Sequence, residues 1–353
     1  MLQKLLATGV VACATVCAYA QDSTKTGTFT LSGNADAYYR YNFSKPKTPP
    51  TYNSFTSFTH SHNSFELGMA SLKAEYTKGK AGVVADLGFG TRAEEFAYND
   101  QNTRLAIKQL YVTYSPSAAV KLTLGSWATH VGYEVLDPYL NRNYSMSYMF
   151  SYGPFSHTGI KADISLGGKS SLMLGVANPT DFRSASGAPK SFLGQFATGS
   201  SDGNFKAYLN FVGGKQSDFK KVIQGDVVLT YAASSQFSVG FNGTVQNVKT
   251  RAVIADPYTS GTWWGSALYL NYDPTSWFGL TARGEYVKDK DDALGLGLGN
   301  VFVPTLSGNF KIDNLTIIPE FRFDAAKNEV FEKSDGTFNK STGQFILAAT
   351  YHF

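Results

Sequence analysis

A two-residue alternation near the start of the chain restricts the possible folds more than any other feature. From Phe29 to Phe43 every second residue is apolar or small: Phe29, Leu31, Gly33, Ala35, Ala37, Tyr39, Tyr41 and Phe43. The residues between them are polar or tyrosine. Successive side chains of a β-strand point to opposite faces, so this segment is a strand with one apolar face. That face has small residues in its middle and aromatics at both ends, which is typical of a strand facing lipid between two interfacial girdles.

The end of the sequence repeats this pattern in a less regular form. Phe345, Leu347, Ala349, Tyr351 and Phe353 share one face, and the sequence ends on Phe353. A terminal aromatic residue on an alternating strand resembles the signal by which bacterial outer-membrane barrels are recognised. We therefore expect the barrel assembly machinery to be a partner of this chain.

Turns and loops divide the sequence into further segments of this kind. We expect strands near residues 28–43, 64–76, 81–90, 105–114, 119–127, 157–166, 171–178, 191–198, 204–213, 222–231, 236–246, 263–272, 277–288, 304–312, 315–324 and 344–353. Short connections alternate with longer polar ones, and an even number of strands brings both ends of a closed antiparallel barrel to one side. The predicted fold class is all-β: a transmembrane antiparallel β-barrel of about 16 strands, with the N- and C-termini in the periplasm.

The first twenty residues predict an export signal. Lys4 precedes an apolar run, and Ala18-Tyr19-Ala20 has the small residues of a cleavage site. We expect residues 1–20 to be a cleaved signal peptide and residues 21–353 to form one domain; an N-terminal membrane anchor is the alternative. Both cysteines lie in residues 1–20, so the mature chain would have no disulfide. Its formal net charge would be close to that of the whole chain, +4, which is too small to indicate nucleic-acid binding.

Two places conflict with a regular strand pattern. Lys108 falls on the same face as Leu110 and Val112, so it would face lipid unless a β-bulge or snorkelling intervenes. The run 65–69 is apolar on the face opposite that of residues 72–76, so either the register breaks there or those side chains pack under a loop.

Charged residues on the opposite face of the strands would line a lumen. They are Asp36, Arg40, Lys73, Glu75, Asp86, Lys121, Lys161, Asp163, Lys206, Asp226, Arg283, Glu285, Glu320 and Arg322. Basic and acidic members are equal in number, so the sequence indicates no preference for either ion sign. A barrel of about sixteen strands is wide enough for an aqueous channel. Alternatively, neighbours such as Arg283 with Glu285, or Glu320 with Arg322, pair across strands and only stiffen the wall.

The longest connection, residues 128–156, carries many aromatic and charged side chains. A loop that only stood in water would not need so many aromatics, so we expect it to fold into the lumen and narrow the pore. A transverse field would then act between Glu134 or Asp137 and Arg142. The alternative is a surface loop packed on its neighbours. The candidate constriction residues are Tyr133, Glu134, Asp137, Asn141, Arg142 and Tyr144.

The same region resembles a known family. Gly132-Tyr133-Glu134, Asp137 and the run Asn141-Arg142-Asn143-Tyr144-Ser145-Met146-Ser147 are similar to the centre of the OmpL-like β-barrel porin family of Bacteroidota, as are Pro154, His157 and Gly159. The resemblance implies a porin-type channel in the outer membrane of a Gram-negative bacterium, and it implies no defined substrate.

The predicted function is passive diffusion of small hydrophilic solutes through a barrel in contact with outer-membrane lipid. A non-conducting barrel that acts as a surface adhesin or scaffold is the main alternative, and a homotrimer is possible. None of the five histidines outside the signal lies in a hydrolase motif, so we expect no enzyme activity, and we expect no cofactor and no metal site. His60 and His62 without acidic neighbours would make a poor metal site.

Overall fold

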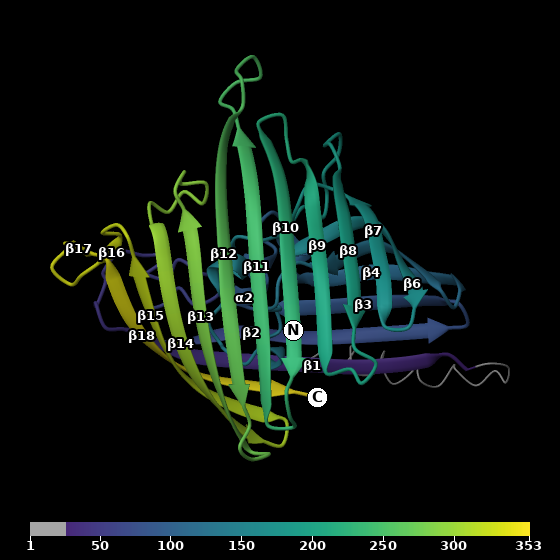
Figure 1. Ribbon diagram of the computed structural model, residues 1–353, viewed down its shortest axis with the longest axis horizontal. Helices are drawn as coiled ribbons and strands as arrows, with labels where there is room; N and C mark the ends of the chain where they lie inside the picture. The colour runs from purple at the N-terminus through teal and green to yellow at the C-terminus, as the bar shows by residue number, and fades with distance from the viewer. Residues whose placement is uncertain (1–25) are drawn as a thin grey trace, which may run out of the picture.

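The computed structural model describes residues 26–353, which form a closed antiparallel barrel (Figure 1). The predicted signal peptide lies outside the described residues. The barrel strands are β1 (Thr28–Asn42), β2 (Ser64–Lys78), β3 (Ala81–Phe89), β4 (Ile107–Ser117), β5 (Val120–Ala128), β6 (Ser156–Gly167), β7 (Ser170–Ala177), β8 (Ser191–Gly199), β9 (Phe205–Lys215), β10 (Lys220–Ala232), β11 (Phe237–Thr250), β12 (Thr259–Tyr272), β13 (Phe278–Asp289), β14 (Gly299–Ile312), β15 (Leu315–Ala326) and β18 (Ser341–His352). Each strand pairs with its neighbours in the chain, and β1 pairs with β18 to close the barrel.

The predicted sixteen-stranded barrel is confirmed, and each predicted strand coincides with an observed one. One addition is a small separate hairpin, β16 (Phe331–Glu332) with β17 (Phe338–Asn339), in the last long connection. Both ends of the barrel sheet lie at one end of the barrel, since Asn34 in the middle of β1 pairs with His352, the last residue of β18. We call this the short-turn end and the other the long-loop end. The assignment of the short-turn end to the periplasm stays a prediction.

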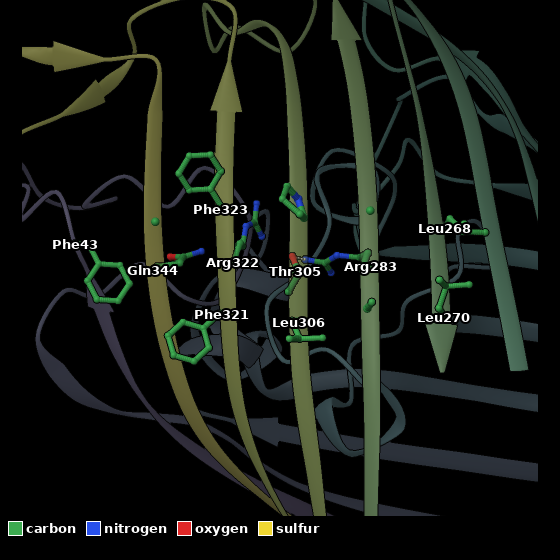
Figure 2. Close-up of a pocket in the computed structure, with 14 residues that line it drawn as sticks. Phe43, Leu268, Leu270, Arg283, Thr305, Leu306, Phe321, Arg322, Phe323 and Gln344 are labelled. Atoms are coloured by element: carbon green, nitrogen blue, oxygen red, sulfur yellow. Dashed lines mark hydrogen bonds between the residues drawn. The ribbon is translucent and has the colours of Figure 1, made fainter. Parts of the chain in front are cut away.

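The outer surface of the barrel is apolar, as the alternation predicts. On β15, Phe321 and Phe323 are 57% and 46% exposed, whereas Arg322 between them is 3% exposed. Figure 2 shows these phenylalanines beside a groove of about 660 Å³, which is also lined by small residues such as Gly284 and Gly343. In a membrane this surface would be in contact with lipid chains.

A bulge in β4 turns Lys108 into the barrel. Asp86 of β3 is opposite Gln109, whereas the next residue, Leu87, is opposite Ile107, so Lys108 is an extra residue in the ladder. Lys108 is 2% exposed. Lys108 therefore does not face lipid, and of the two explanations that the sequence left open, a bulge or snorkelling, the bulge is the correct one.

The second irregularity is a break in the register between β1 and β2. Ala35 is opposite Ala70, whereas Ala37 is opposite Leu67, so β2 contains one more residue than β1 over this interval. Phe65 is 83% exposed on the outer surface, as is the Leu72 side chain at 45%. The register break is thus the correct one of the two explanations.

Four short helices lie in the long connections. They are α2 (Thr91–Phe96), η1 (Asn102–Ala106), η2 (Pro138–Leu140) and α3 (Tyr148–Ser151). The sequence pattern predicted none of them. No helix in the part of the chain that the structure describes is long and apolar enough to cross a membrane.

Candidate pore and its inner loop

The connection between β5 and β6, residues 129–155, lies inside the barrel; we call it the inner loop. Its residues Tyr144, Met146 and Tyr148 are at most 1% exposed. They lie against inward-facing side chains of the barrel wall, as the hydrogen bonds of this segment to β13, β14 and β15 demonstrate. The loop therefore covers one wall of the lumen from within.

Buried wall carboxylates hold the inner loop by its backbone. Glu320 of β15 accepts hydrogen bonds from the amides of Tyr144 (2.7 Å) and Ser145 (3.0 Å). Glu285 of β13 accepts from the amides of Tyr148 and Met149, both at 3.0 Å, at the start of α3. Hydrogen bonds to a charged acceptor are stronger than neutral ones. The amides of Tyr148 and Met149 have no partner within α3, because the first amides of a helix lack an intrahelical acceptor. The two carboxylates thus fix the loop at two successive points.

A third carboxylate fixes the end of the inner loop. Asp181, in the connection 178–190, accepts from the amides of Phe155 (2.7 Å) and Ser156 (2.8 Å), and from the Tyr98 hydroxyl (3.0 Å). Burial raises the pKa of Asp181 to about 6. Asp181 therefore binds the loop as Glu285 and Glu320 do: one carboxylate accepts hydrogen bonds from two consecutive backbone amides.

Two buried arginines on the wall also bind the inner loop. Arg283 pairs with Glu134 (2.5 Å) and donates to the Ser145 carbonyl (2.7 Å). Arg322 pairs with Asp324 and donates to the Met146 carbonyl, both at 2.7 Å. The expected pairs Arg283 with Glu285 and Glu320 with Arg322 are not the ones formed. Arg283 pairs with Glu134 of the loop, and Arg322 pairs with Asp324 of its own strand, while Glu285 and Glu320 bind loop amides.

The inner loop also reaches a second wall. Asp137 pairs with the bulged Lys108 (2.5 Å), which also lies 3.2 Å from Asp86. Lys108 is on β4 and Arg283 is on β13, seven strands apart by the shorter way round the closed barrel. Residues 134–137 therefore form a strut between nearly opposite walls, ending on Arg283 at one side and on Lys108 at the other.

At the short-turn end the loop is held by Arg142 and Tyr139. Arg142 lies 2.9 Å from Asp273, which also binds Lys311 at 3.0 Å. The Tyr139 ring stacks on His352, with centroids 4.7 Å apart. Since Glu134, Asp137 and Arg142 each have an oppositely charged wall partner, the expected transverse field between Glu134 or Asp137 and Arg142 is not what the geometry provides.

The other expected site residues take mainly structural positions. Asn141 bonds with Val135 inside the loop, and the Tyr133 ring stacks on Tyr269 at 4.1 Å. Asp36 accepts from the Tyr144 hydroxyl (2.5 Å), and the fully buried Arg40 donates to Gln344 and to two carbonyls of the first long loop. These contacts join the wall to the loops inside the barrel.

Two further long loops also enter the lumen, which the sequence did not indicate. Arg92 of α2 is fully buried, 3.7 Å from Asp36, and its guanidinium lies 4.7 Å from the Phe58 ring centroid. The first, second and inner loops share one apolar cluster with a single wall residue, Met69. Its members are Phe58, Met69, Ala93, Phe96, Leu136, Met146, Phe150 and Phe155.

A polar row on the adjacent wall holds the start of the inner loop. Asn210 and Asn242 donate to the two oxygens of Asp226 at 2.7 and 2.6 Å, and Gly132 donates its amide to Asp226 at 3.1 Å. Burial lowers the pKa of the nearby His130 to about 4, so this imidazole is neutral at neutral pH. Asp226 thus also contributes to anchoring. The two asparagines were not predicted, because an uncharged polar residue on a lumenal face is common in the sequence and indicates no particular role.

Several charged residues on the inward face of β2, β5, β6 and β9 stay partly exposed. Lys73 and Glu75 of β2 are 31% and 38% exposed and lie 2.9 Å apart. Lys161 and Asp163 of β6 are 20% and 35% exposed and lie 3.1 Å apart. Lys121 of β5 and Lys206 of β9 are also exposed. Their alternation with Leu124 and Leu209, which are exposed on the outer surface, places both lysines on the inward face.

The described residues contain no cluster of three or more metal-ligating side chains. His60 instead lies 3.2 Å from Glu95 of α2.

Comparison with protein families identifies the chain. The family model described as "Putative beta-barrel porin-2, OmpL-like" matches residues 28–353, which is the whole barrel. The chain belongs to this family. It is therefore a porin-type channel of the outer membrane of a Gram-negative bacterium. The resemblance read from the sequence is confirmed, while the assignment to Bacteroidota stays a prediction. No curated protein matches the chain.

Solved structures with the same fold are outer-membrane proteins. The outer membrane channel DcaP of Acinetobacter baumannii has 12% identity and a TM-score of 0.62, over 93% of this chain and 97% of that one. The anion-selective porin from Comamonas acidovorans has 11% identity and a TM-score of 0.60, over 93% and 100%. OmpT of Vibrio cholerae has 11% identity and a TM-score of 0.60, over 94% and 99%. At these identities the likeness establishes the barrel fold alone.

Proposed function

We propose that this porin-type channel conducts small hydrophilic solutes by passive diffusion, between the inner loop and the wall formed by β2 to β9. The observation that carries the proposal is the uneven distribution of exposed charge inside the barrel. Apart from Arg142 and Lys311 at the short-turn end, the loop and the wall from β12 to β18 bury their charges against each other. On the opposite side Lys73, Glu75, Lys121, Lys161 and Asp163 stay at least partly exposed. Exposed charges keep a passage wet.

In this proposal the inner loop sets the width of the passage. Glu134 and Asp137 would narrow the passage as the two ends of the strut. The position of the loop on either side of the strut would be fixed by Tyr133, Asn141, Arg142 and Tyr144. A loop held by many buried hydrogen bonds keeps its position, so the passage beside it keeps a constant width. We therefore expect a permanently open channel and not a gated one.

The family and the fold are those of channels, and we propose that the chain has no enzyme activity. The alternative, a non-conducting barrel that works as an adhesin or scaffold, is favoured by one observation: three loops share an apolar cluster inside the lumen. Conduction decides between the two.

The experiment is single-channel recording in a planar bilayer, with protein whose heat-modifiable mobility on a gel demonstrates a folded barrel. A matched variant replaces residues 132–153 by a short Gly-Ser turn, since Ala128 and Ser156 are already paired neighbours. We expect open steps from the full chain and larger steps from the variant. A folded, silent full chain would refute the channel and support the scaffold.

Several partners follow from the same proposal. Outer-membrane lipid would cover the apolar outer surface, and the barrel assembly machinery would read the C-terminal strand. One solved relative is described as a trimer form of OmpT of Vibrio cholerae, at 12% identity. We propose a homotrimer for this chain too, which light scattering of the detergent-solubilised protein would test.

A further inference from the structure

The structure divides the lumenal charges into two groups that differ in sign. Eight of the fourteen expected lumenal charges are almost fully buried against the loops or against neighbouring wall side chains: Asp36, Arg40, Asp86, Asp226, Arg283, Glu285, Glu320 and Arg322. The six that stay exposed are four lysines and two carboxylates: Lys73, Lys121, Lys161, Lys206, Glu75 and Asp163. The equal count of the sequence therefore does not describe the surface that a solute meets.

We propose that this exposed set makes the passage selective for small anionic solutes, such as carboxylates, phosphates and halides. The inference rests on the proposed diffusion function and adds the class of solute. A lumenal wall with excess fixed positive charge raises the local concentration of anions and lowers that of cations.

The lysines of this wall exceed the carboxylates available to neutralise them. Asp163 is next to Lys121 across β5 and β6, but its carboxylate lies 3.1 Å from Lys161. Among residues 26–353, neither Lys121 nor Lys206 has a carboxylate oxygen within 4.0 Å, whereas Lys73 has Glu75 at 2.9 Å. Lys121 and Lys206 therefore act as the uncompensated charges of the passage.

Two cations at the short-turn end of the lumen add to the excess of positive charge. Arg142 and Lys311 are 27% and 38% exposed and share the single carboxylate of Asp273. The excess of positive charge thus extends from the wall of β2 to β9 to the opening at this end.

Acidic residues at the long-loop end attract cations, but they reduce the preference for anions less than their number suggests. Glu66 of β2 and Glu94 and Glu95 of α2 line a pocket of about 660 Å³ that is open to solvent. Glu95 already lies 3.2 Å from His60. Charges in open solvent are screened over about 8 Å at physiological salt. Lys121 and Lys206 are the second residues of β5 and β9, so they lie on the inward face at the short-turn end, where Arg142 and Lys311 also lie. We infer that the charges at this opening determine the selectivity.

The expected size follows from Coulomb's law. A unit charge about 8 Å from an ion in water changes the local concentration of that ion roughly twofold, upwards for an anion and downwards for a cation. We therefore expect neutralisation of both Lys121 and Lys206 to lower the chloride-to-potassium permeability ratio by at least about twofold.

The test is the reversal potential of single channels in a potassium chloride gradient, for the full chain and for Lys121→Gln with Lys206→Gln. The matched control is Lys221→Gln with Lys249→Gln, which changes the net charge equally. These two lysines are cross-strand neighbours at the long-loop end, in alternation with the outward-facing Ile223 and Val245.

We expect the full chain and the control to prefer chloride and the lumenal variant to lose that preference. Open channels of the full chain that prefer potassium, or a lumenal variant with an unchanged reversal potential, would overturn the inference while the diffusion function stands. A folded chain without conductance would overturn the diffusion function and the inference together.

Discussion

Replacement of Glu320 by glutamine tests whether wall carboxylates hold the inner loop. The carboxylate is fully buried and accepts from Tyr144, Ser145 and the Ser307 hydroxyl at 2.7 to 3.0 Å. Glutamine keeps the shape and one acceptor oxygen, but its amide group then faces a donor. No hydrogen bond at this site is then charge-assisted, and the N–H of Tyr144 or Ser145 is left facing another donor.

The size of the effect follows from these contacts. Hydrogen bonds to charged groups contribute about 1.5 to 3 kcal/mol, and an unsatisfied buried donor costs about 1 to 3 kcal/mol. The two contributions overlap, so we expect about 2 to 4 kcal/mol, which is roughly a thirtyfold to several-hundredfold increase in local opening at 1.4 kcal/mol per factor of ten. The barrel sheet keeps its own hydrogen bonds, so the change is confined to the loop.

Amide hydrogen exchange of the protein in nanodiscs measures this change. We expect faster exchange at residues 144–145 in Glu320→Gln and at residues 148–149 in Glu285→Gln. Glu75→Gln is the matched control, because Glu75 is exposed in the lumen and pairs with Lys73. If both buried variants exchange like the unmodified chain in folded barrels, the carboxylates do not anchor the loop and the reasoning is refuted.

Two further variants test other anchors. Lys108→Met leaves Asp86 and Asp137 without their shared cation, and breaking such a buried pair costs about 3 to 5 kcal/mol. The heat-modifiable gel shift should therefore occur at a lower temperature than in the control Lys78→Met, which changes an exposed lysine. An equal shift in both variants would contradict this. Burial raises the pKa of Asp181 from 3.8 to about 6, so the folded state binds a proton more tightly than the unfolded state does. This adds about 3 kcal/mol to the free energy of unfolding below pH 4, and the contribution is lost as the pH rises through 6. Thermal unfolding from pH 4 to 7 should therefore depend less on pH in Asp181→Asn, and identical pH profiles would rule the effect out.

The barrel could be predicted from the sequence because its determinants are local. Each strand carries its own two-residue alternation, and each turn follows directly, so all sixteen barrel strands could be placed. Even the position of the bulge was indicated, since Lys108 interrupts an otherwise apolar face. The even number of strands then makes β1 and β18 antiparallel, as their pairing across the closure requires.

The lumen could not be predicted in the same way, because its contacts join residues far apart in the sequence. Glu320 is recognisable as inward-facing, but nothing in its neighbourhood indicates that it binds the backbone of residues 144 and 145. The same holds for Arg92, whose position on α2 inside the barrel depends on the packing of three loops. Strand periodicity gives the face of a residue, and loop packing decides whether that face is wet.

The inner loop therefore determines both the width of the proposed passage and the sign of its charge. Its removal would uncover more wall carboxylates than wall cations. Five carboxylates would lose loop contacts, Asp36, Asp226, Glu285, Glu320 and Asp324, against three cations, Lys108, Arg283 and Arg322. We expect the variant without residues 132–153 to conduct more and at the same time to shift its permeability from chloride towards potassium. A wider channel with an unchanged or stronger chloride preference would contradict the assignment of the buried carboxylates to the loop. Both quantities come from one recording, so the loop's steric and electrostatic contributions can be separated in a single variant.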